Sequence, residues 1–147
     1  MTLKIGADEM MGYLDEVFPQ VRGMFGIDRL DDDLLIMRLF NQDRHLRPGG
    51  TVSGPAMFSL ADVAAYVATL ARIGRQPLTV TTHCSIDFMR KPASGLDILA
   101  EARMLKLGRT LSVTDVLLFS EGESRPLAHA SLTYAIPPAS RPPVSSL

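Results

Sequence analysis

Apolar residues recur at three- and four-residue steps along residues 8–25. This spacing predicts an amphipathic helix that kinks or breaks at Pro19, because proline lacks the N–H that a helix interior requires. Residues 30–40 then alternate loosely between apolar and polar side chains, which predicts a strand. The polar, glycine-containing residues 41–50 predict a loop.

The longest apolar run, residues 55–73, is apolar on nearly all sides of a helix and therefore predicts a buried core helix. Pro55 suits its first turn, where a missing N–H has no intrahelical partner, and Gly74 suits its end. The two-residue break Gly108-Arg109 predicts a β-hairpin. Four β-prone runs, separated by turn signals, follow the helix. They span residues 78–89, 98–107, 110–119 and 127–136.

The order helix, strand, long helix and four strands with short connections predicts an α+β fold. We expect an antiparallel sheet of about five strands wrapped around the central helix, in a single domain over residues 1–136. The proline- and serine-rich residues 137–147 predict an extended or disordered tail. The apolar run is slightly short for a bilayer span and is interrupted by polar residues, so we expect no membrane insertion.

Composition narrows the functional classes further. The chain has 147 residues, 46% of them hydrophobic, and a formal net charge of -1, which indicates a soluble globular protein and gives no basic field for nucleic acid. The single Cys84 cannot close an intramolecular disulfide, and the N-terminal residues do not resemble a targeting segment, so we expect a cytoplasmic protein. The histidines, His45, His83 and His129, lack metal-ligand spacing, so we expect no metal.

Asp62 is the residue that most clearly suggests a functional site, because no other charged residue lies between Arg47 and Arg72. An ionised carboxylate in such apolar surroundings must be paired, protonated or exposed to a cleft in which it works. Two interpretations follow: a catalytic carboxylate, or a structural one bound to a backbone N–H or an arginine. The helix start at Gly54 also offers N–H groups that could hold a developing oxyanion.

Three segments resemble hotdog-fold acyl-coenzyme A thioesterases of the phenylacetate-pathway (PaaI-like) type. They are GTVSGPAMFSLAD (residues 50–62), VTTHCSIDFMRKP (80–92) and AEARMLKLGRTLSV (100–113). The resemblance implies a hotdog fold and thioester hydrolysis at a dimer interface. In this chain it implies that Asp62 activates water or attacks the carbonyl, that the Gly54 N–H binds the oxyanion, and that the Thr81 hydroxyl orients the water.

The sequence departs from the family motif at three positions. Ser53 replaces a histidine, Pro55 replaces the second glycine, and Arg47 replaces an asparagine that helps to place the water. Arg47 has three open interpretations: a partner that holds Asp62 ionised, a clamp for the thioester carbonyl or a substrate carboxylate, or a solvated loop residue.

The resemblance also implies which residues surround the substrate. Pro55 and Phe58 would lie beside it, and Arg90, Lys91 and Arg109 near the coenzyme A phosphates. No cofactor is implied besides coenzyme A as part of the substrate. The expected assembly is a homodimer, or a dimer of dimers. The alternative function is a non-catalytic acyl-coenzyme A binding protein that has lost turnover together with the family's asparagine and histidine.

Overall fold

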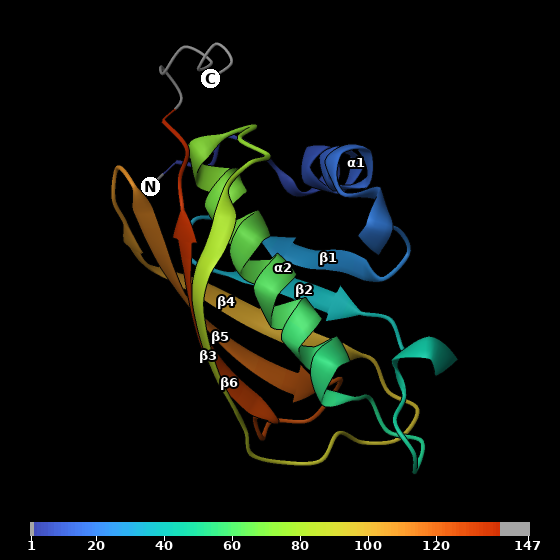
Figure 1. Ribbon diagram of the computed structural model, residues 1–147. Coiled ribbons are helices and arrows are strands. Elements are labelled where there is room, and N and C mark those ends of the chain that lie inside the picture. The colour runs from blue at the N-terminus through green and yellow to red at the C-terminus, as the bar shows by residue number, and fades with distance from the viewer. Residues whose placement is uncertain (1, 139–147) are drawn as a thin grey trace, which may run out of the picture.

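The computed structural model describes residues 2–138, so most of the predicted tail lies outside the described residues (Figure 1). The helices are α1 (Ala7–Val17) and α2 (Gly54–Ile73), with short 3-10 turns at Pro19–Val21 and Asp43–His45. The strands are β1 (Phe25–Leu30), β2 (Leu35–Leu39), β3 (Val80–Phe88), β4 (Ile98–Leu107), β5 (Leu111–Ser120) and β6 (Ala128–Ala135).

The six strands form one antiparallel sheet in the order β1-β2-β4-β5-β6-β3. Figure 1 shows α2 lying across one face of this curved sheet, with α1 beside β1. This confirms the predicted α+β hotdog layout, in which a sheet wraps around a long central helix. The predicted hairpin is also present, since the Gly108 N–H donates to the Leu111 carbonyl at 2.8 Å between β4 and β5.

The prediction for residues 8–40 was wrong in two respects, and the sheet has six strands rather than about five. The break expected at Pro19 is present, since the first helix ends at Val17 and a 3-10 turn begins at Pro19, but Phe25 begins a strand instead of extending the helix. The predicted single strand over residues 30–40 is the second half of a hairpin. Asp31 makes its turn, because its Oδ1 accepts the N–H groups of Asp33 and Leu34 at 2.9 and 3.0 Å.

The core lies between α2 and the inward-facing strand residues. Leu60, Val67 and Leu70 on the helix are completely buried. Each such side chain contributes about 1.5–3 kcal/mol through removal from water. The helix is long and apolar enough to cross a membrane by length and composition alone, but 78% of its most apolar window is buried inside the fold. Inward-facing strand residues of the core include Met37, Ala100, Val116, Leu118, Ala130 and Leu132.

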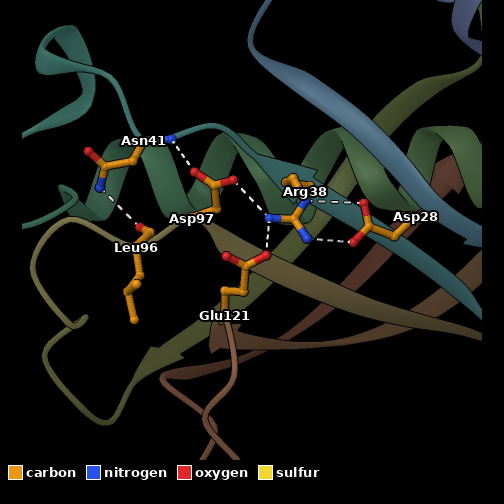
Figure 2. A network of polar contacts seen from close by, with 6 residues as sticks. All are labelled: Asp28, Arg38, Asn41, Leu96, Asp97 and Glu121. Carbon is orange, nitrogen blue, oxygen red and sulfur yellow. Dashed lines mark hydrogen bonds and ion pairs between the residues drawn. The ribbon is translucent and has the colours of Figure 1, made fainter.

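Figure 2 shows how Arg38 on β2 connects three carboxylates from separate segments. Its guanidinium donates to both carboxylate oxygens of Asp28 at 2.8 and 3.2 Å, donates to Asp97 at 2.8 Å, and also pairs with Glu121. The hydrogen bonds to Asp28 and then Asp97 raise the pKa of Arg38. Asp97 in turn accepts the backbone N–H of Asn41 at 2.8 Å. The network therefore anchors the start of the loop that leads to α2.

Strand β3 forms one edge of the sheet, because it pairs with β6 and its other side has no partner among residues 2–138. Val80 and Phe88, at its two ends, are 57% and 49% exposed. An edge with unpaired backbone groups and exposed apolar side chains can pair with another strand. The candidate site lies next to this edge.

Candidate active site

The N-terminus of α2 presents one free backbone donor. The Ser53 hydroxyl caps the helix by accepting the Ala56 N–H at 3.2 Å, and the Met57 N–H donates to the Ser53 carbonyl at 3.0 Å. Pro55 has no N–H to donate. Gly54 is therefore the residue of the first turn whose N–H has no partner within residues 2–138, at the end of the helix where the dipole favours negative charge.

The loop before α2 carries Arg47 on a tight turn. The Arg47 N–H donates to the Thr51 carbonyl at 2.9 Å, and the Gly50 N–H donates to the Arg47 carbonyl at 3.0 Å. Gly49 and Gly50 adopt φ values of 102° and 84°, which glycine accepts without steric cost. The Arg47 side chain is exposed and pairs with no carboxylate in the described part of the chain. Within one chain, Arg47 therefore does not hold Asp62 ionised.

Asp62, which is half-buried on α2, has one carboxylate oxygen held by two hydroxyl groups. The Thr81 hydroxyl on β3 donates to Oδ1 at 2.7 Å, and the Tyr134 hydroxyl on β6 lies 2.7 Å from the same atom. The Tyr134 hydroxyl is also 2.8 Å from the Asp62 backbone carbonyl. No group within residues 2–138 donates to Oδ2. The carboxylate is thus oriented through one oxygen, and the other can accept a proton or attack a carbon atom.

A β-bulge turns Thr81 toward α2. Thr81 pairs with Tyr134 and His83 with Thr133, so Thr82 is an extra residue in the ladder. In a regular ladder without the bulge, Thr82 rather than Thr81 would share the inward face with Cys84, because successive strand residues point to opposite faces. The bulge shifts this parity by one residue, as bulges near functional sites often do. It therefore creates the contact between Thr81 and Asp62.

Tyr134 is the site residue that the sequence interpretation missed. Its side chain is 4% exposed, and burial, followed by the charge of Asp62, raises its pKa, so the hydroxyl keeps its proton as a donor. A signal for it was present in the alternation of β6, since Tyr134 shares the parity of Leu132 and Ala130, which face the helix. That parity places a tyrosine on the inward face beside the only carboxylate of the core helix.

A cavity of about 290 Å³ extends from Asp62. Three aromatic side chains line it: the ring of Phe18 meets Tyr66 edge-on with centroids 6.5 Å apart, and Tyr66 lies 5.9 Å from Tyr134. The Tyr66 hydroxyl donates to the Pro77 carbonyl at 2.9 Å, and burial raises the pKa of Tyr66 to about 12. The aromatic rings therefore form part of the cavity wall, and the Tyr66 hydroxyl is already engaged by the backbone.

Gly54 and Asp62 lie too far apart to act on one carbonyl group from the same chain. Asp62 lies eight positions after Gly54 on the helix, which corresponds to about 12 Å along the axis. Their neighbours on β3 differ as well: a Cβ atom on Gly54 would lie 3.7 Å from the Phe88 ring at the end of the strand, whereas Asp62 contacts Thr81 near its start. The two groups occupy opposite ends of the edge strand.

The remaining predicted substrate-contacting residues are exposed and divided between the two ends of the sheet. Phe58 is 37% exposed on α2. Arg90 donates to the Pro126 carbonyl at 3.0 Å and, with Lys91, lines an open pocket of about 470 Å³ beyond the end of β3. Arg109 lies in the β4–β5 hairpin at the opposite end of the sheet. A single chain therefore does not bring Arg109 together with Arg90 and Lys91.

Comparison with known proteins identifies the family of this chain. The thioesterase superfamily matches residues 49–126, more than half of the chain. A crystal structure of a protein assigned as a thioesterase from Silicibacter sp. TM1040 is 59% identical, covers 94% of this chain and 96% of its own, and has a TM-score of 0.89. The chain therefore belongs to the thioesterase superfamily.

More distant solved structures share the fold. The phenylacetic acid degradation protein PaaI from Thermus thermophilus, in a mutant form, is 23% identical over 81% of this chain and 99% of its own, with a TM-score of 0.69. A thioesterase protein from Streptococcus pneumoniae, solved with coenzyme A, is 19% identical over 86% and 96%, with a TM-score of 0.74. A comparison with curated proteins gave no match. At these identities the two structures establish only the fold.

Proposed function

We propose that this protein is an acyl-coenzyme A thioesterase in which Asp62 acts as general base or nucleophile. The observation that carries the proposal is the asymmetric carboxylate, with Oδ1 held by Thr81 and Tyr134 and Oδ2 left without a donor beside a cavity. A carboxylate oriented in this way suits proton abstraction from water or attack on a carbonyl carbon. Membership of the thioesterase superfamily supports this chemistry.

The active site would be completed by a second subunit. Antiparallel pairing of two β3 edges about a two-fold axis between Cys84 and Ser85 would place Thr81 opposite the partner subunit's Phe88. Because Asp62 contacts Thr81 and Gly54 lies beside Phe88, this pairing would bring the carboxylate of one subunit toward the helix start of the other. It would thereby remove the separation of about 12 Å that exists within one chain.

The reaction would then proceed at the junction of the two subunits. The thioester carbonyl accepts the Gly54 N–H, which stabilises the oxyanion that forms. Water attacks the carbonyl carbon and gives a proton to Oδ2 of Asp62. The C–S bond breaks as the tetrahedral intermediate collapses, and the coenzyme A thiolate leaves and takes up a proton. In the nucleophilic route Oδ2 itself attacks the carbonyl carbon, and water hydrolyses the resulting mixed anhydride.

Charged residues around the site would hold the rest of the substrate. Arg47, exposed on its turn, is available to bind the thioester carbonyl or a substrate carboxylate. Arg90 and Lys91, at the same end of β3 as Gly54, would contact the coenzyme A phosphates, and Pro55 and Phe58 would border the entrance. Coenzyme A bound to the Streptococcus pneumoniae structure supports this class of ligand.

Two substitutions test the catalytic assignment. Asp62→Asn should abolish acyl-coenzyme A hydrolysis, since an amide is neither a base nor a nucleophile here, while the melting temperature stays close to that of the wild type. Gly54→Ala should fold, because its Cβ would make an ordinary contact with Phe88, but the methyl group should hinder the approach of the carbonyl to the N–H. Hydrolysis retained in Asp62→Asn would refute the proposal.

The alternative is an acyl-coenzyme A binding protein without turnover. One observation favours it: Ser53, which replaces the family's histidine, has its hydroxyl oxygen engaged in capping α2. Titration with a non-hydrolysable thioether analogue, beside a hydrolysis assay on the same preparation, distinguishes the two functions. Binding without turnover would support the alternative. The expected dimer, or dimer of dimers, is testable by light scattering on the same sample.

A further inference from the structure

We infer that the cavity beside Asp62 receives the acyl group and selects a compact, apolar one, with Phe18 limiting its size. The inference rests on the proposed function and adds a substrate class to the same site. It depends on three properties of the cavity: its volume, the engagement of its hydroxyl protons, and the position of Phe18 in its wall.

The volume favours a compact group. At about 290 Å³ the cavity is roughly twice the size of the ~150 Å³ apolar cavity that holds one benzene molecule. It also lies near the lower end of small-molecule sites, which span about 300–1,000 Å³. One aromatic ring with a short spacer, or a medium aliphatic chain, fits this space. A long fatty acyl chain exceeds this volume and would extend beyond the cavity.

The hydroxyl groups that line the cavity already donate their protons to the protein. Thr81 and Tyr134 donate to Asp62, Tyr66 donates to the Pro77 carbonyl, and Thr79 donates to the Gln76 carbonyl at 2.8 Å. A hydroxyl group has one proton and can then only accept.

A carboxylate on the acyl group would therefore find no free hydroxyl donor among the lining side chains and would lose hydrogen bonds to water without replacement by them. It would also lie near the charge of Asp62. The Arg47 side chain, which is available as a substrate clamp, is not part of the cavity wall. An alkyl or aryl group meets neither penalty, because it needs no hydrogen bond.

Phe18 lines the same cavity as Asp62 and Tyr66. It follows α1 directly and is half-buried, with its ring against that of Tyr66. Shortening this side chain would enlarge the cavity, because its ring is part of the lining. The acyl group that fits best should therefore become longer when Phe18 is truncated.

The test compares substrates on the wild-type protein first. Hexanoyl- and phenylacetyl-coenzyme A should be hydrolysed with kcat/KM at least about 100-fold above that of glutaryl-coenzyme A, which has a carboxylate at the end of a chain of similar length. In Phe18→Ala, the ratio of decanoyl to hexanoyl kcat/KM should rise about tenfold. Phe40→Ala, the same change at a residue outside the cavity wall, should leave that ratio unaltered.

The outcomes separate this inference from the proposed function. Hydrolysis without a preference against glutaryl-coenzyme A, or a glutaryl preference, would overturn the inference and leave the thioesterase assignment intact. If no substrate is hydrolysed, the proposed function fails, and competition between S-hexyl-coenzyme A and its carboxylated analogue still decides the inference. Tighter binding of the S-hexyl compound would support it, and equal or weaker binding would overturn it. The wild-type comparisons do not depend on the folding of Phe18→Ala.

Discussion

Replacing Tyr134 with phenylalanine should lower kcat while leaving KM nearly constant. The change removes a hydroxyl that lies 2.7 Å from Asp62 Oδ1 and keeps the ring, so the packing against Tyr66 persists. Thr81 then remains as the single donor to Oδ1 within the described residues. The carboxylate gains freedom to rotate, and Oδ2 is held less well for reaction.

The size of the effect follows from the contact. A hydrogen bond to a charged group contributes about 1.5–3 kcal/mol, and we take the lower limit because Thr81 still holds the same oxygen. About 1.4 kcal/mol corresponds to a tenfold change in rate, so kcat should fall about tenfold. The same loss should lower the melting temperature by about 3–6 °C for a domain of this size.

The assay is thiol release from a saturating acyl-coenzyme A, with kcat and KM measured for Tyr134→Phe, Thr81→Val and the double variant. Both hydroxyls bind the same oxygen atom, so their effects on kcat should not be additive. The fold-decrease in kcat of the double variant should therefore differ from the product of the two single decreases. Tyr13→Phe is the matched control, since this buried ring lies under Arg75 and does not line the cavity beside Asp62.

The reasoning is refuted if Tyr134→Phe keeps kcat within about twofold of the wild type while Thr81→Val loses activity. In that case Thr81 alone would orient Asp62, and the contact with Tyr134 would serve only stability. A fall in kcat equal to that of Tyr13→Phe would lead to the same conclusion.

Three further changes test the fold. Burial raises the pKa of Tyr134 and Tyr66, so the folded state holds their protons more tightly than the unfolded state does. Their contribution to the free energy of unfolding is therefore full below pH 10 and falls above it by up to about 1.4 kcal/mol per pH unit for each group. Denaturant unfolding between pH 9 and 11 should show a shallower loss of that free energy in Tyr134→Phe. Arg38→Met should destabilise the fold by about 1–3 kcal/mol, a range that allows for the exposure of Glu121. Arg38→Lys should destabilise it by less, because lysine keeps the charge but not the two-pronged guanidinium that binds both oxygens of Asp28. Equal unfolding midpoints for Arg38→Met and the wild type would contradict this. Ser53→Ala should lower stability by about 1 kcal/mol and Ser53→Gly by only a few tenths, as expected of a helix cap; a loss of kcat in both variants without a change in stability would instead assign Ser53 a catalytic role.

The sequence predicted the second half of the fold closely, because its periodic signals are long and its turn residues are distinct. The helix predicted over residues 55–73 is α2 (Gly54–Ile73), and the strand predicted over residues 98–107 is β4. The prediction for residues 25–40 was wrong because β1, with six residues, and β2, with five, are too short to show a clear alternation. Their turn depends on the Asp31 side chain, whose hydrogen bonds a hydrophobicity pattern does not reveal.

The site was predictable in part. Asp62 could be found because a single charge in an apolar helix is conspicuous, and Thr81 because its segment resembles a known motif. The contact between Asp62 and Tyr134 spans 72 residues and depends on the β3–β6 register, including the bulge after Thr81. One residue more or fewer in that register would turn Thr81 away, so local sequence patterns cannot predict the arrangement.

The unequal surroundings of the two Asp62 oxygens have a consequence for isotope labelling. Suppose that Asp62 attacks the thioester and that water then attacks the aspartyl carbon of the mixed anhydride. Turnover in heavy-oxygen water would place label in the Asp62 carboxylate, at the position of the oxygen that left with the acyl group. If Thr81 and Tyr134 prevent the carboxylate from rotating, each later turnover replaces the same atom. Mass spectrometry of the peptide containing Asp62 would then show incorporation that stops at one heavy oxygen, however many turnovers have passed.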